Sequence, residues 1–130
     1  MGGLNLAPRV TREDGREIVS KLRTATTHWE KFRGLMLDTS LQPGEALWID
    51  QCQAIHCCFM KIPIDVVFLS HEGEVLHLIE RMAPWTFSKY VRKASQVLEC
   101  YPGTIEQHGL SIGMKLKIVD REECLFCQKS

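Results

Sequence analysis

Apolar and polar residues follow the two-residue period of β-strands in several short stretches of the chain. The clearest stretch is 64–69, Ile-Asp-Val-Val-Phe-Leu, which is rich in β-branched residues and almost wholly apolar, as in a strand covered on both faces. Residues 70–73, Ser-His-Glu-Gly, suit a turn, because the glycine is free to adopt a positive φ. Residues 74–79 then alternate again, so the pattern predicts an antiparallel hairpin over 64–80.

Weaker versions of the same pattern predict further strands at 16–24, 46–49, 54–60, 95–100 and 114–119. Pro63 ends the strand at 54–60, because proline has no amide proton to give to a ladder. One short helix is expected at 28–35, after a capping box. A second is expected at 105–108, before Gly109, and residues 82–91 read as a loop that wraps the body.

Strands outnumber helices, so the predicted fold is mostly β with two short helices, a β-rich α+β domain. Its sheet is expected to be strongly bent or to form a partial barrel. No repeat, linker or low-complexity tract divides the 130 residues, which are enough to bury a core. We therefore expect one domain over 15–120, with an N-terminal lead at 1–14 and a C-terminal tail at 121–130.

The composition narrows the classes of partner. Lys and Arg total 16 and so do Asp and Glu, which gives a net charge of zero. Nucleic acid and anionic membranes reward a basic surface, so neither is expected as a partner. No apolar run reaches the roughly 18 residues that a membrane helix needs, and the first residues lack a signal-peptide pattern. We therefore expect a cytoplasmic protein without membrane insertion.

Two carboxylates interrupt apolar strands, Asp65 in the hairpin and Glu99 in the stretch Val-Leu-Glu-Cys. A buried carboxylate is costly unless it is paired or hydrogen-bonded. Asp65 is either a ligand-facing acid, paired with Arg33 or His56, or a structural group that accepts backbone amides or anchors Arg33. Glu99 presents the same two alternatives.

His56, Cys58 and Met60 are two residues apart, so their side chains share one face if 54–60 is a strand. Such soft ligands suit copper(I) or zinc. Side chains two residues apart on a strand are about 6.5 Å apart along it, however, which is awkward for three ligands of one ion. We therefore expect Cys58 and Met60 in the core and His56 as a hydrogen-bonded polar residue.

Cys124 and Cys127 form a C-x-x-C in the tail, which is half of a zinc-site pattern. A four-ligand site needs a second pair, so no metal or cofactor is predicted, and zinc is the alternative. In a reducing compartment the two thiols should stay reduced. Leu125 and Phe126 between them favour a tail that folds back on the body.

Several blocks of the sequence, taken together in their order and spacing, resemble a known family. The blocks are Thr27-x-x-Glu30-x-x-Arg33-Gly34-Leu35-Met36, Ile55-His56-x-x-x-Met60-x-x-Pro63-Ile64-Asp65-Val66-Val67-Phe68-Leu69, Gly73-x-Val75-Leu76, Pro84-Trp85, Val97-Leu98-Glu99, Gly103 and Gly109-Leu110-x-x-Gly113. From about residue 25 to 119 the chain is similar to the bacterial and archaeal family called domain of unknown function 192. The resemblance implies a compact, mostly β fold of this length and no established activity.

The resemblance has limits. Many relatives carry an export signal or a lipid anchor, and this chain shows neither. Where relatives often have Thr followed by an aromatic residue, this chain has Cys57 and Cys58. The family pattern does not account for the tail.

No complete catalytic motif is present, so no catalytic residue is assigned. We expect a non-catalytic binding or accessory domain for a small molecule or a protein. Its candidate ligand-binding residues are Arg33, His56, Met60, Asp65, Trp85 and Glu99. One alternative is a thiol or metal-binding protein that uses Cys124 and Cys127. The other is a hydrolase-like enzyme that uses His56 and Asp65, for which the sequence offers no nucleophile.

Overall fold

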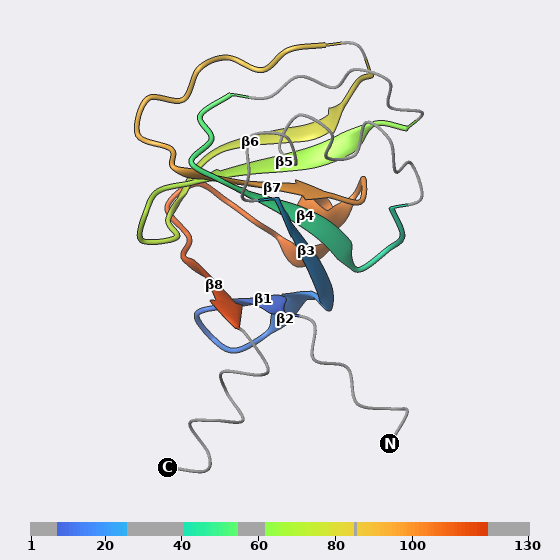
Figure 1. The fold of residues 1–130 in the computed structure, drawn as a ribbon. Helices are drawn as coiled ribbons and strands as arrows, with labels where there is room; N and C mark the ends of the chain where they lie inside the picture. The colour runs from blue at the N-terminus through green and yellow to red at the C-terminus, as the bar shows by residue number, and fades with distance from the viewer. Residues whose placement is uncertain (1–7, 26–40, 55–61, 85, 120–130) are drawn as a thin grey trace.

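The computed structural model describes residues 8–25, 41–54, 62–84 and 86–119 (Figure 1). This part of the chain contains eight strands and one short helix, so the mostly β fold class is confirmed. The strands form two sheets, and among the described residues these sheets do not close into a barrel. No helix in these segments is long and apolar enough to cross a membrane.

The larger sheet has five strands in the order β3-β4-β7-β5-β6. The strands are β3 (Lys21–Ala25), β4 (Glu45–Asp50), β5 (Ile64–Leu69), β6 (Val75–Met82) and β7 (Gln96–Cys100). Only β3 and β4 pair in parallel, and the other neighbours are antiparallel. The central strand β7 therefore lies between two strands that precede it in the chain.

The predicted hairpin is confirmed. β5 and β6 pair antiparallel, with Val67 opposite Leu78, and every residue of β5 is buried, as its apolar composition predicts. The Gly73 amide closes the turn by donating to the Ser70 carbonyl at 2.9 Å. Gly73 has φ +91, and a Cβ there would meet the carbonyl oxygen of Leu116. Only glycine fits this close approach of the hairpin turn to the C-terminal part of the fold.

The smaller sheet has the order β2-β1-β8, with β1 at Arg9–Arg12, β2 at Glu17–Val19 and β8 at Leu116–Val119. The prediction of one strand over 16–24 is wrong, because Ser20 separates β2 from β3 in the other sheet. The Ser20 amide leaves the ladder and donates to the Gly44 carbonyl at 2.9 Å. Strand β1 lies inside the stretch predicted as an N-terminal lead.

Three further strands and the helix of the described part of the chain lie where the sequence pattern predicts them. The strands predicted at 46–49, 95–100 and 114–119 correspond to β4, β7 and β8, and the second helix is α2 (Thr104–His108). The helix predicted at 28–35 lies outside the described residues. So does the strand predicted at 54–60, apart from its first residue, which is not in a strand.

Two apolar clusters occupy opposite faces of the larger sheet. One consists of Leu41, Leu47, Ile49, Ile64, Val66, Phe68, Met82, Val91, Ala94 and Val97. The other, which includes residues of the smaller sheet and α2, consists of Val10, Ile18, Val19, Leu22, Ala46, Val67, Leu69, Val75, Leu98, Cys100, Ile105, Leu110 and Leu116. We call them the first and the second core. Strand alternation explains the division, because successive side chains of β5 and β7 enter different cores.

Candidate functional site

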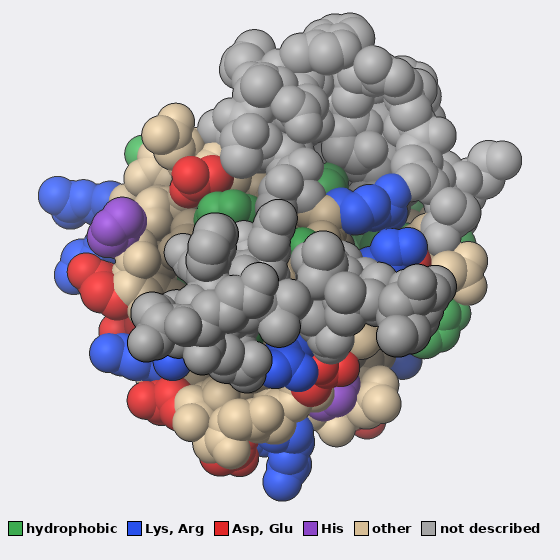
Figure 2. Space-filling view, turned by 60° about the horizontal axis from the view of Figure 1, so that its bottom comes forward, with side chains coloured by type: hydrophobic (Ala, Val, Ile, Leu, Met, Phe, Trp, Pro, Cys, Tyr) green, Lys and Arg blue, Asp and Glu red, His purple; other side chains and the backbone are tan. Residues whose placement is uncertain are grey.

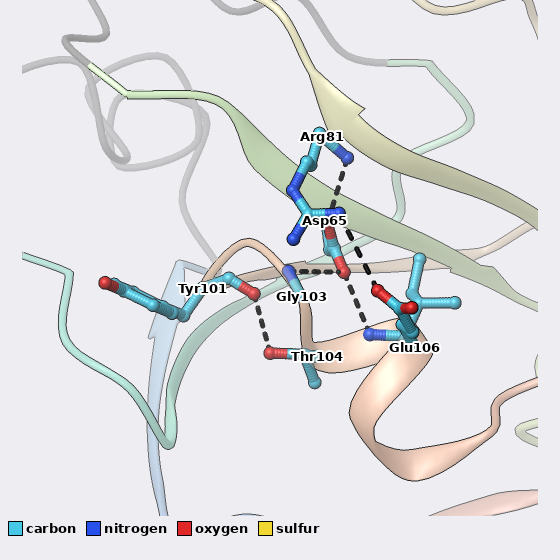
Figure 3. Close-up of polar contacts among 7 residues, drawn as sticks. Asp65, Arg81, Tyr101, Gly103, Thr104 and Glu106 are labelled. Carbon is cyan, nitrogen blue, oxygen red and sulfur yellow. Dashed lines mark hydrogen bonds and ion pairs between the residues drawn. The ribbon is translucent and has the colours of Figure 1, made fainter.

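The Asp65 carboxylate lies at the junction of β5, β6 and α2 and is fully buried (Figure 3). Its Oδ1 accepts a hydrogen bond from the Arg81 amide at 2.9 Å. Its Oδ2 accepts from the Gly103 amide at 3.1 Å and from the Ile105 amide at 2.8 Å. Both oxygens are thus occupied by backbone donors, as the structural interpretation of this residue requires.

The donors explain why a carboxylate occupies this position. The first amides of a helix have no partner within the helix, and α2 has no capping side chain of its own. Asp65 supplies that acceptor from a different strand. It also holds Arg81, which has φ +51 where β6 bulges against β5. The Arg81 side chain turns toward the helix, with its Nη1 3.9 Å from Glu106 Oε1 (Figure 3).

Glu99 is the fourth of the five residues of the central strand β7, opposite Leu47 of β4 on one side and Val66 of β5 on the other. Only 7% of the residue is exposed. Within the described part of the chain, its carboxylate has neither a hydrogen-bond donor nor a cation at ion-pair distance. Burial raises the pKa of Glu99 from 4.5 to about 7. At neutral pH the group therefore exists in both protonation states.

The two strand acids face different cores. In the ladder Asp65 is opposite Cys100, whereas Glu99 is opposite Val66, the next residue along β5. Cys100 and Val66 belong to the second and the first core respectively. Burial, and then the charges of Asp65 and Glu99, raise the pKa of the Cys100 thiol, which keeps this thiol protonated and unreactive. The structure does not bring Asp65 and Glu99 into one pocket.

The surroundings of Glu99 are apolar. Leu47, Val66 and Val97 belong to the first core and lie beside it on the same face of the sheet. Across the sheet, the neighbour of Leu47 on its other side is Arg23 of β3, which is half-buried. A single carboxyl surrounded by aliphatic side chains can bind a donor group of a ligand or change its protonation state.

The other residues singled out from the sequence, Arg33, His56, Met60, Trp85, Cys124 and Cys127, lie outside the described residues. No group of three or more His, Cys, Asp or Glu side chains in the described segments could hold a metal ion.

Sequence reasoning missed one cluster of polar residues, Arg9, Thr11, Lys115 and Lys117, which line a groove beside the smaller sheet. Its members come from opposite ends of the chain. The only local signal is the alternation of Lys115 and Lys117 with the apolar residues of β8.

The chain is similar in sequence to two archaeal proteins. A UPF0127 protein of Thermococcus sibiricus is 30% identical over 120 residues, which cover 88% of this chain and 76% of the relative. A UPF0127 protein of Pyrococcus furiosus is 28% identical over 116 residues, which cover 79% of this chain and 90% of the relative.

Two solved structures share the fold. A protein of unknown function from Novosphingobium aromaticivorans has a TM-score of 0.73 at 23% identity, covering 85% of this chain and 82% of that one. A Sinorhizobium meliloti protein, provisionally described as a transcription regulator, has a TM-score of 0.72 at 21% identity, covering 90% of this chain and 98% of that one. Residues 9–118 match the DUF192 family, described as "Uncharacterized ACR". Because this match spans both sheets and the helix between β7 and β8, the chain belongs to the DUF192 family.

Proposed function

We propose that this protein is a non-catalytic binding domain, and that a small ligand binds beside Glu99 on the face of the larger sheet that carries the first core. Glu99 is the group that orients the ligand, and its aliphatic neighbours contact the apolar part. Arg33, His56, Met60 and Trp85 are proposed as further lining residues. Asp65 faces the second core and belongs to the scaffold.

One observation carries this proposal. Glu99 is 7% exposed, and no described residue gives its carboxylate a hydrogen bond or an opposite charge. Burying such a group costs folding free energy unless a hydrogen bond or an opposite charge compensates it. Ligand sites combine apolar walls with a few polar groups and a perturbed pKa, and the surroundings of Glu99 have all three features. A ligand that donates to the carboxyl would offset the cost of its burial.

The chemistry of the carboxyl defines the ligand class. The ionised form accepts hydrogen bonds and attracts a cation, and the protonated form also donates one hydrogen bond. With a pKa of about 7, both forms are available near neutral pH. We therefore propose a ligand with an apolar body and a single amine, amide or hydroxyl group.

The test is a screen of small aliphatic and aromatic amines and amides, followed by NMR of the labelled protein. Binders should shift backbone amide signals of Leu47, Val66 and Val97. They should lose affinity in Glu99→Leu, which keeps an apolar side chain and removes the acceptor. Glu106→Gln changes an exposed carboxylate and serves as the matched control.

Compounds that bind the Glu99→Leu and Glu106→Gln variants with the same affinity would overturn the proposal. So would a screen in which no compound shifts these three amide signals. Circular dichroism of the Glu99→Leu protein verifies that the variant is folded before its affinity is compared.

A further inference from the structure

The smaller sheet forms one wall of a groove with a volume of about 530 Å³, separate from the surroundings of Glu99. Thr11 is directly opposite Lys117 in the β1–β8 ladder, so these two side chains lie on the same face of the sheet. Arg9 is two residues from Thr11, and Lys115 is two residues from Lys117, and both also line the groove. The turn that contains Gly15 and the hairpin residue Glu72 complete the lining.

Positive charge is concentrated in this groove, although the chain as a whole has a net charge of zero. Its lining contains four basic side chains, Arg9, Arg12, Lys115 and Lys117, and two carboxylates, Glu13 and Glu72. Arg9 pairs with Glu17 at 3.1 Å, and Arg12 lies 3.9 Å from Asp14. Among the described residues, Lys115 and Lys117 have no carboxylate at ion-pair distance. Figure 2 brings this end of the molecule forward and shows Lys and Arg side chains interspersed with Asp and Glu side chains around the outer edge of the view.

Two polar groups in the lining make no hydrogen bond within the described structure, and one of them, the Arg9 Nε, is a buried donor. Thr11 is only 6% exposed, and within the described structure its hydroxyl makes no hydrogen bond. The Nε of Arg9 is buried and has no acceptor. Buried donors in native proteins are nearly always satisfied, and an unsatisfied donor costs free energy. Hydroxyl, guanidinium and ammonium groups line the same groove, so its complementary partner is an acceptor with negative charge.

We propose that this groove is a binding site for a small oxyanion-bearing ligand, a phosphate ester or a polycarboxylate, held by Thr11, Arg9, Lys115 and Lys117. The Thr11 hydroxyl and the Arg9 Nε donate to the oxyanion. The two lysines, which have no described carboxylate at ion-pair distance, supply positive charge to the oxyanion. The volume is within the range of sites that hold small metabolites, so the remainder of such a ligand fits beside its charged group.

The probes are pyrophosphate and citrate, titrated by calorimetry and by NMR at constant ionic strength. The test variant is Lys115→Gln/Lys117→Gln, which removes two charges from the groove. The matched control is Arg92→Gln/Lys93→Gln, which removes two charges from an exposed loop elsewhere. Thr11→Val replaces the hydroxyl with a methyl group of similar size and tests the contribution of the hydroxyl donor.

Saturable binding with shifts at Thr11 and Lys117 is expected. It should weaken about tenfold in the lysine variant and stay unchanged in the control. The Thr11→Val substitution should weaken binding of the probe several-fold and leave the free energy of unfolding unchanged. Tighter binding of pyrophosphate identifies the phosphate ester, and tighter binding of citrate identifies the polycarboxylate. Equal weakening in both double variants, or no saturation by either probe, would overturn the proposal.

Discussion

Asp65 Oδ2 accepts a hydrogen bond from the backbone amide of Ile105 at 2.8 Å, across 40 residues of sequence. This contact joins the central part of the larger sheet to the first turn of α2. Together with the bonds from Gly103 and Arg81, it makes one side chain the common acceptor for a helix start and a strand bulge. The three donors are backbone groups, so no other side chain needs to change for the junction to fail.

Replacing Asp65 with Ala should lower the free energy of unfolding by about 3 kcal/mol, because three amides lose a charged acceptor in a buried place. Asp65→Asn should recover only part of the loss, since its NH₂ group would face backbone donors. Urea denaturation measures both effects, with the exposed Glu72→Gln as control. An unchanged midpoint in Asp65→Ala would contradict the structural role.

Glu99 should make the stability depend on pH. Its pKa is raised from 4.5 to about 7 in the folded protein, so between these values the folded state binds more protons than the unfolded state. The free energy of unfolding should therefore fall as pH rises through this window, by about 3 kcal/mol in total, and then level off. In Glu99→Gln this component should be absent. Urea denaturation of both proteins at about pH 5 and about pH 8 checks the difference, and parallel profiles would refute it.

Gly73 and Gly15 provide a matched pair, with φ +91 and φ +87. Alanine at Gly15 has open space around its Cβ and should cost only the backbone strain, about 1 kcal/mol. Alanine at Gly73 bears the same strain and also collides with the Leu116 carbonyl, so its cost should be at least twice as large. Thermal unfolding measures the melting temperatures of the two variants. Equal melting temperatures would show that the backbone at Leu116 moves aside at little cost.

Gln96 connects three segments. Its Oε1 accepts from Trp48 Nε1 at 2.9 Å, and its Nε2 donates to the carbonyl oxygens of Ser70 at 2.8 Å and His71 at 3.3 Å. Gln96→Ala should therefore cost about 1–2 kcal/mol. It should also speed hydrogen exchange of the Gly73 amide more than that of amides in β4. Uniform acceleration across the sheet would point to global destabilisation instead.

The hairpin was predictable because its information is local. Residues 64–69 are β-branched and apolar, and Gly73 supplies the positive φ of the turn. Strand β1 was not predictable in this way. Arg9-Val10-Thr11-Arg12 contains one apolar side chain, and the strand is held by pairing with β8 more than 100 residues later. The division at Ser20 likewise depends on a carbonyl from residue 44, which no local pattern reveals.

For the candidate site, sequence identified two residues and left their roles open. An acid within an apolar strand is visible in the sequence, and both Asp65 and Glu99 are buried. Which core each one faces follows from strand register, which depends on partners far away in the chain. Asp65 has three backbone donors and Glu99 has none in the described structure, a difference that depends on the position of α2.

The late position of β7 in the chain has a consequence for biosynthesis. Strands β4 and β5 leave the ribosome first, but neither has a neighbour on its inner side until residues 96–100 insert between them. A nascent chain that stops short of Cys100 thus carries two bare strand edges in the middle of its sheet, the kind of surface that recruits other chains. Chaperone demand should therefore peak just before β7 emerges, and truncated products should aggregate rather than accumulate as partly folded monomers.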